Sequence, residues 1–183
     1  LASLKALAEA DAAGQSAATA LDIEEIDVAP VDIVAAEGTP SLDPAAIHTA
    51  LKAAYGQIEA FMKANGLENN GAPIAITRFY DESGWGFEAA VAFTATDAAK
   101  TKAQAASANG PLKIKQTYAG RALKATHIGP YRNLPEVYRQ LEDRMAGKKL
   151  DPNGQPWEQY LNGPDTTPED QLKTDVYVPF KAT

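Results

Sequence analysis

Side chains able to do chemistry gather in one short segment, Trp157-Glu158-Gln159-Tyr160. If this segment is a strand, alternation places Glu158 and Tyr160 on one face and Trp157 and Leu161 on the other. If Trp157 and Leu161 pack on helices, Glu158 and Tyr160 face a cleft. A carboxylate beside aromatic rings binds cations by charge and by cation–π attraction. Composition alone favours a solvated or cross-strand-paired glutamate, because charged side chains are usually exposed.

Three further aromatic residues are candidates to line such a site. Tyr177 lies in the last predicted strand and is as compatible with an ordinary position in a sheet as with ligand contact. Trp85 lies between two glycines in a predicted hairpin turn, where it either closes a pocket or covers an edge of the core. Phe79 shares strand parity with Ala75, the residue that an internal repeat aligns with Glu158.

The composition excludes several kinds of site. The chain has no cysteine, which excludes disulfides, thiolate zinc ligands and cysteine nucleophiles. Its two histidines, His48 and His127, are far apart and outside any H-E-x-x-H pattern. We expect His127 to be structural and His48 to be exposed. The sequence therefore predicts no metal site and no cofactor.

The charge of the chain bears on its partners. The net charge is −7 and the basic stretches are short, so we expect no nucleic acid to bind, because a duplex-binding surface needs a basic stripe. No apolar run approaches the roughly 18 residues of a membrane helix. The first residues lack an initiator Met and the charge order of a secretion signal. We expect a cytoplasmic protein that is either processed or a fragment.

The predicted elements divide the chain into a tail and one domain. Residues 1–13 have the apolar spacing of a short helix, and residues 14–19 have the composition of a linker. We therefore expect 1–20 to be a helical tail, compatible with the end of a preceding domain in a longer protein, and 21–183 to be the main domain.

The first part of the main domain combines strands with a capped helix. Residues 23–36 alternate as a strand, with Pro30 as a break or bulge. Asp43 and Pro44 form a helix start, and Gly66 is placed as the glycine that ends that helix. Strands are expected at 74–80 and 86–93, whereas 96–109 is either a helix or a surface crossover.

The second part repeats this order. The sequence predicts strands at 113–117, 121–127, 157–161 and 173–180, and a helix that begins at Leu134-Pro135. Residues 67–74 align with 150–157 through identical Leu, Asn, Gly and Pro. The segment F-E-A-A-V-A-F at 87–93 likewise aligns with T-D-V-Y-V-P-F at 174–180.

The repeat predicts an α+β fold made of tandem duplicated β-α-β-β units, with halves at about 23–94 and 112–181. The units would form a mostly antiparallel sheet with two main helices on one face and a ligand cleft on the other. The halves differ where Ala75 aligns with Glu158 and Ala90 with Tyr177. These differences predict a single asymmetric site in the second half.

Three motifs in order resemble the GyrI-like domain, which is also the effector-binding domain of AraC- and MerR-type bacterial regulators. They are H-I-G-P-Y at 127–131 before a helix, G-Q-P-W-E-Q-Y-L-N at 154–162, and T-D-V-Y-V-P at 174–179. The resemblance implies a pocket for small, often cationic or amphipathic aromatic compounds, with a buried glutamate at Glu158. The helix-turn-helix of those regulators is absent from this sequence, since no pair of short helices carries a basic recognition surface.

Three functions remain open from the sequence. The first is a binding module for a small hydrophobic, cationic aromatic molecule, as a stand-alone sensor or sequestering protein or as a regulatory domain. The second is a hydrolase of strained or electrophilic ring compounds, with Glu158 as general base oriented by Tyr160. The third is a protein-binding, inhibitor-type module. The sequence shows no nucleophile–base–orienter set, which favours the first.

Overall fold

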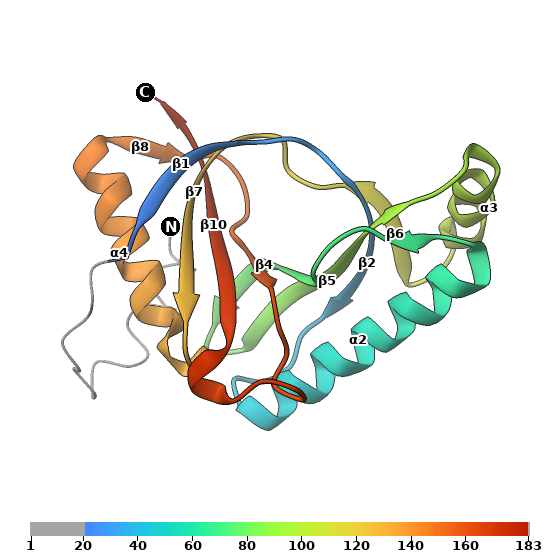
Figure 1. Ribbon diagram of the computed structural model, residues 1–183, viewed down its shortest axis with the longest axis horizontal. Helices are drawn as coiled ribbons and strands as arrows, with labels where there is room; N and C mark the ends of the chain where they lie inside the picture. Colours follow the sequence, from blue (N-terminus) through green and yellow to red (C-terminus); the bar gives the residue numbers. More distant parts are fainter. Residues whose placement is uncertain (1–20, 183) are drawn as a thin grey trace. The chain divides into compact units, whose positions relative to one another are not determined.

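The computed structural model describes residues 21–182, an α+β chain whose paired strands are antiparallel (Figure 1). The predicted helix at 1–13 and the linker at 14–19 lie outside the described residues. The chain divides into two compact units. Unit 1 combines residues 21–28 with residues 119–182, and unit 2 is the continuous segment Ala29–Tyr118. The predicted α+β class is confirmed.

Unit 2 is a four-stranded antiparallel sheet with two helices. The strand order is β4-β5-β2-β6, and the short strand β3 pairs with β5. In chain order the elements are β2 (Asp32–Gly38), α2 (Pro44–Asn65), β3 (Glu68–Asn69), β4 (Ile74–Asp81), β5 (Gly84–Thr94), α3 (Asp97–Ser107) and β6 (Leu112–Gln116).

The main helix of unit 2 begins and ends as its sequence predicts. The Asp43 carboxylate accepts a hydrogen bond from the amide of Ala46 at 2.9 Å, and Pro44 occupies the first helical position. Gly66 ends the helix in the left-handed conformation, with φ of 70°. The buried face of α2, which includes Ile58 and Met62, packs on β2 and β5. The undecided segment 96–109 contains a helix, α3, capped by Thr96.

Unit 1 repeats the arrangement with one long helix. Its strand order is β1-β7-β10-β9, and β8 pairs with β10. The elements are β1 (Ile23–Val28), β7 (Gly120–Ile128), the 3-10 helix η1 (Tyr131–Asn133), α4 (Leu134–Lys148), β8 (Leu150–Pro152), β9 (Trp157–Tyr160), the 3-10 helix η2 (Glu169–Gln171) and β10 (Lys173–Ala182).

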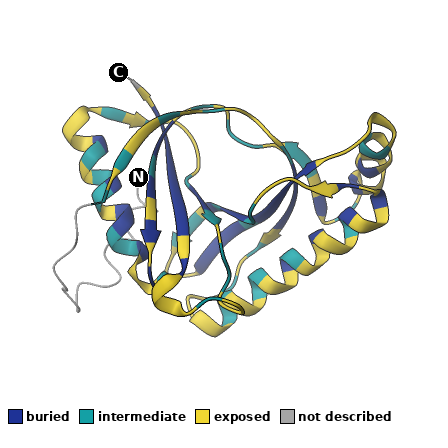
Figure 2. Ribbon diagram, viewed as in Figure 1, coloured by how far each residue is buried: buried dark blue, intermediate teal, exposed yellow. Residues whose placement is uncertain are grey.

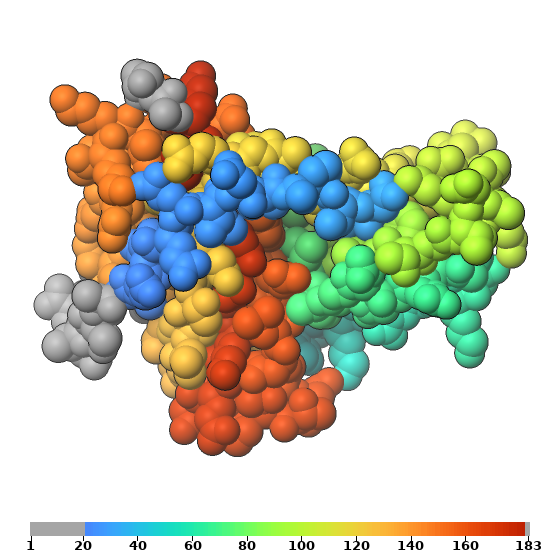
Figure 3. Space-filling view, turned by 45° about the horizontal axis from the view of Figure 1, so that its top comes forward, coloured from blue at the N-terminus to red at the C-terminus, as the bar shows by residue number. Residues whose placement is uncertain are grey.

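The stretch 23–36 becomes two strands that belong to different units. The chain leaves β1 at Val28, passes Pro30 and enters β2 at Asp32. Strand β1 pairs with β7 in unit 1, and Figure 3 shows this blue strand along the yellow β7 on the surface. Strand β6 pairs with β2 in unit 2. Each compact unit therefore differs from a half of the sequence repeat by its outer strand.

The core of each unit lies along its central strands. Figure 2 shows buried residues concentrated on β2 and β5 in unit 2 and on β7 and β10 in unit 1. Small residues allow close packing at two positions of unit 2. A side chain at Gly38 would place its Cβ 2.4 Å from the ring of the fully buried Phe87. A side chain at Gly86 would meet the ring of Phe79 at 2.1 Å.

Candidate functional site

A buried glutamate in unit 1 is held by two tyrosine hydroxyls. Glu158 on β9 is 5% exposed. The hydroxyl of Tyr138 donates to Oε1 at 3.0 Å, and the hydroxyl of Tyr160 donates to Oε2 at 2.7 Å. Both carboxylate oxygens are thus fixed by hydrogen bonds that favour the charged form.

The position of Glu158 depends on the pairing of β9 and on the buried face of α4. In the antiparallel register Glu158 lies opposite Val176 of β10. Its partner Tyr138 lies on the buried face of α4, with Val137 and Leu141. Glu158 therefore points toward α4. The predicted cleft position of Glu158 required Trp157 to pack on the helices, and Trp157 does not pack there.

Trp157 packs on the other face of the sheet. It lies opposite Tyr177 in the β9–β10 register, and the two rings stack with centroids 4.7 Å apart and planes 7° apart. This pairing gives the large indole an aromatic neighbour away from α4. With Trp157 on that face, strand alternation turns Glu158 to the helix side.

The electrostatics of Glu158 are those of an acid without a cationic partner. Burial raises its pKa above the ordinary value of 4.5, while the hydrogen bonds from Tyr160 and Tyr138 lower it, and burial is the largest effect. Among residues 21–182 its hydrogen-bond partners are these two tyrosines, and no lysine or arginine forms an ion pair with it. A cationic ligand next to this carboxylate would therefore neutralise a charge that no lysine or arginine of residues 21–182 pairs.

A third tyrosine extends this cluster. Tyr131 in η1 packs edge-on against Tyr160, with ring centroids 5.6 Å apart. Partial burial raises the pKa of Tyr131, and the nearby charge of Glu158 raises it further. We call Glu158, Tyr131, Tyr138 and Tyr160 the tyrosine–glutamate cluster. Negatively polarised ring faces around a carboxylate are suited to a cation.

Tyr177 belongs to a separate polar group on the opposite face of the same sheet. Its hydroxyl donates to the buried Asp175 at 3.4 Å, and Lys124 forms an ion pair with Asp175 at 3.0 Å. Burial and the charge of Asp175 raise the pKa of Tyr177 to about 12. Since Lys124 neutralises this acid, the group already contains its own cation.

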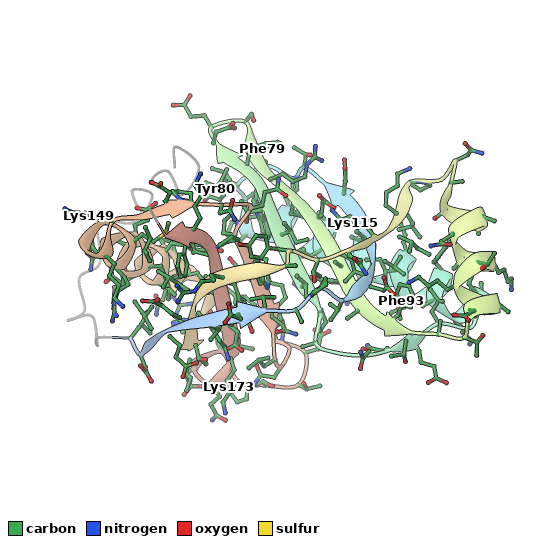
Figure 4. The ribbon with its side chains drawn as sticks, turned by 90° about the horizontal axis from the view of Figure 1, so that it is seen from above. Phe79, Tyr80, Phe93, Lys115, Lys149 and Lys173 are labelled. Carbon is green, nitrogen blue, oxygen red and sulfur yellow. The ribbon has the colours of Figure 1, made fainter. Side chains whose placement is uncertain are left out.

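The other two predicted site residues lie in unit 2. Trp85 is 7% exposed, and its indole N–H donates to the hydroxyl of Thr77 at 3.1 Å. Its ring packs against Phe87 at 5.1 Å between centroids. Phe79 is half-buried near the turn of the β4–β5 hairpin, beside Tyr80 (Figure 4). Of the five predicted residues, the structure brings Glu158 and Tyr160 into direct contact.

Two members of the cluster were not predicted as site residues. Tyr138 lies in the predicted helix that begins at Leu134-Pro135, and Tyr131 ends the H-I-G-P-Y motif before it. A signal was present for Tyr138, because a tyrosine among Val137, Leu141 and Met145 carries a hydroxyl that needs a buried partner. His127 is buried and contacts the carbonyl of Pro130 through Nε2 at 3.1 Å, whereas His48 is exposed, as expected.

Other surfaces of the described chain offer less chemistry. An open depression of about 610 Å³ in unit 2 lies at the start of α2, with small side chains and the capping Asp43 along it. Within residues 21–182 no three His, Asp or Glu side chains are grouped to hold a metal ion. None of the described helices combines the length and apolarity needed to cross a bilayer.

Most of the described chain matches the model of one protein family. Residues 21–181 match the model of the GyrI-like small molecule binding domain. The chain belongs to this GyrI-like family. It is therefore a small-molecule binding domain of this family, as the sequence motifs implied.

Solved structures similar to this GyrI-like chain share its fold at low sequence identity. The EcmrR C-terminal domain has a TM-score of 0.74 and 17% identity, covering 90% of this chain and 100% of that one. A hydrolase from Listeria innocua has a TM-score of 0.62 and 15% identity, covering 90% and 94%. SAV2435 bound to tetraphenylphosphonium has a TM-score of 0.55 and 10% identity, covering 87% and 94%. None of the curated proteins matches the chain.

Proposed function

We propose that this GyrI-like domain binds small hydrophobic cations, with Glu158 as the anion that neutralises them. The observation that carries the proposal is a buried carboxylate that two tyrosines hold and that no lysine or arginine of residues 21–182 pairs. An isolated buried charge is costly. A cationic ligand would remove that cost, and the rings of Tyr131 and Tyr160 would add cation–π attraction.

The chemistry of a related protein supports the same ligand class. SAV2435 is described as bound to tetraphenylphosphonium, a permanent cation surrounded by aromatic rings. A domain of this kind would act as a stand-alone sensor or sequestering module, or as the regulatory domain of a longer protein.

The test is calorimetric titration of tetraphenylphosphonium into wild type and Glu158→Gln. Two unit charges about 4 Å apart attract by roughly 4 kcal/mol near a protein surface, and part of this is used to ionise the buried acid. We therefore expect the glutamine variant to bind at least about tenfold more weakly, or about 1.4 kcal/mol.

The matched control is Glu88→Gln. Glu88 is a largely buried acid of unit 2 that already forms an ion pair with Lys115, so its removal should leave the affinity unchanged. Equal affinities of wild type and Glu158→Gln would refute the anchoring role. Equal losses in both variants would show that net charge alone attracts the cation.

Hydrolysis is a second candidate, favoured by the raised pKa of Glu158 and by its contact with Tyr160. A carboxyl whose pKa is raised by burial and whose oxygen contacts Tyr160 can serve as a general acid or base. In this case Glu158 and Tyr160 are the catalytic residues. Incubation with electrophilic ring compounds, followed by chromatography of products, tests it, and turnover that persists in Glu158→Gln would exclude this mechanism.

A further inference from the structure

We infer that Thr174 is a second polar contact of the tyrosine–glutamate cluster and selects ligands whose cation carries an N–H, namely protonated amines, over permanent cations. The inference rests on the proposed binding of cations at Glu158 and adds a specificity to it.

The first observation is an unpartnered hydroxyl in the core. Thr174 on β10 is 0% exposed, and its Oγ1 has no hydrogen-bond partner among the described residues. A buried hydroxyl without a partner destabilises a fold, and valine has the same shape without this cost. A ligand that accepts or donates a hydrogen bond at Oγ1 of Thr174 would remove this cost.

The second observation is the position of this hydroxyl. In the β9–β10 register Thr174 lies directly opposite Tyr160, so both side chains are on the face that carries Glu158. Directly opposed residues of antiparallel strands have Cβ atoms about 5 Å apart, and diagonal neighbours about 7 to 8 Å apart. Thr174 is thus a diagonal neighbour of Glu158 on the α4 side of the sheet.

The internal repeat supplies a third observation. The alignment of 87–93 with 174–180 places Thr174 at the position of Phe87. Thr174 lies opposite His127 on β7, and Phe87 lies opposite Gly38 on β2, so His127 and Gly38 are equivalent as well. Unit 2 fills this position with the apolar pair Gly38 and Phe87, whereas unit 1 has the polar pair His127 and Thr174. At this aligned position the polar pair is in the unit that also holds Glu158 in place of Ala75.

The hydrogen-bonding capacity of the cluster defines the ligand. A carboxylate offers about four lone-pair directions, and tyrosine hydroxyls take one on each oxygen of Glu158. A threonine oxygen accepts as well as donates. A protonated amine can direct one N–H to Glu158 and another to Oγ1 of Thr174. A phosphonium or quaternary ammonium ion has no N–H and gains only the charge and ring contacts.

The test compares two probes on three proteins. The probes are a lipophilic arylalkyl primary amine, protonated at the pH used, and its trimethylammonium analogue. The proteins are wild type, Thr174→Val and Thr174→Ser. We expect Thr174→Val to weaken the amine by about tenfold or more, because a hydrogen bond to a charged group is lost, and to leave the quaternary ion unaffected. Thr174→Ser keeps the hydroxyl and should retain amine binding.

Stability of the ligand-free proteins gives an independent readout. Removal of an unpartnered hydroxyl should raise the melting temperature of Thr174→Val above that of wild type. A lower melting temperature would show that the hydroxyl has a structural partner, and would overturn the inference. Equal effects of Thr174→Val on both probes would overturn it too.

The outcome also separates this inference from the proposed function. Loss of both probes in Glu158→Gln, with no difference between probes in Thr174→Val, refutes the role of Thr174 and leaves cation binding intact. Binding of both probes that is unchanged in Glu158→Gln refutes both proposals.

Discussion

Cation binding at Glu158 should depend on pH in a way that the burial of this carboxyl determines. Burial raises the pKa of Glu158, and no cation in the described chain offsets that effect. A cation binds the ionised carboxylate, so binding below the raised pKa must first release a proton. One carboxyl accounts for one proton, and the affinity for tetraphenylphosphonium should rise about tenfold per pH unit in that range. It should level off above the pKa of the free protein.

Titration calorimetry in two buffers of different ionisation enthalpy measures the number of protons released. We expect close to one proton below the raised pKa and none well above it. The matched control is Glu158→Gln, in which weak residual binding should be independent of pH. An affinity for wild type that does not change with pH, or a slope that persists in the glutamine variant, would refute the assignment of the proton to Glu158.

The remaining predictions concern pH and packing. The pKa of Glu158 is raised in the folded state, so this residue stabilises the fold fully below the ordinary pKa of 4.5, and that stabilisation is lost as pH rises through the folded pKa. Glutamine does not titrate. In chemical denaturation, the free energy of unfolding of Glu158→Gln should therefore rise relative to that of wild type over this pH range. Tyr138→Phe removes a hydrogen bond that lowers the pKa of Glu158, and should move the pH midpoint of cation binding upward; an unchanged midpoint would contradict this. Gly38→Ala should cost about 1 to 3 kcal/mol, because Phe87 is fully buried and cannot move aside, whereas Gly56→Ala, on an open helix surface, should gain about 1 kcal/mol. Similar melting temperatures for the two alanine variants would refute the packing argument.

The sequence predicted the ends of the main helix of unit 2 correctly because interactions within a few residues determine them. Asp43, Pro44 and Gly66 mark the ends of α2, and each acts through hydrogen bonds or dihedral angles within a few residues. The division of residues 23–36 between two units was not predicted. Pro30 indicates a break between two strands, but the partner of each strand lies elsewhere in the chain. The alternation of apolar and polar residues along a strand does not show which other strand it pairs with.

The candidate site was predicted in part for a related reason. Alternation along β9 correctly groups Glu158 with Tyr160, since it depends on the strand alone. Which face meets α4 depends on the stacking of Trp157 with Tyr177 across two strands, whereas the predicted cleft position of Glu158 required Trp157 to pack on the helices. The hydroxyl of Tyr138 reaches the carboxylate from a helix, so only the packed structure reveals it.

The exchange of outer strands has a consequence for the synthesis of the chain. Unit 2 is continuous and has all its strands once residue 118 has emerged. Strand β1 precedes unit 2 in the chain, yet its partner residues on β7, such as Ala125 opposite Ile23, follow roughly 100 residues later. At 5 to 20 residues per second this is a delay of about 5 to 20 s. During that time β1 has no partner strand in its own unit, and its acidic residues Glu24, Glu25 and Asp27 would discourage pairing with other newly made chains.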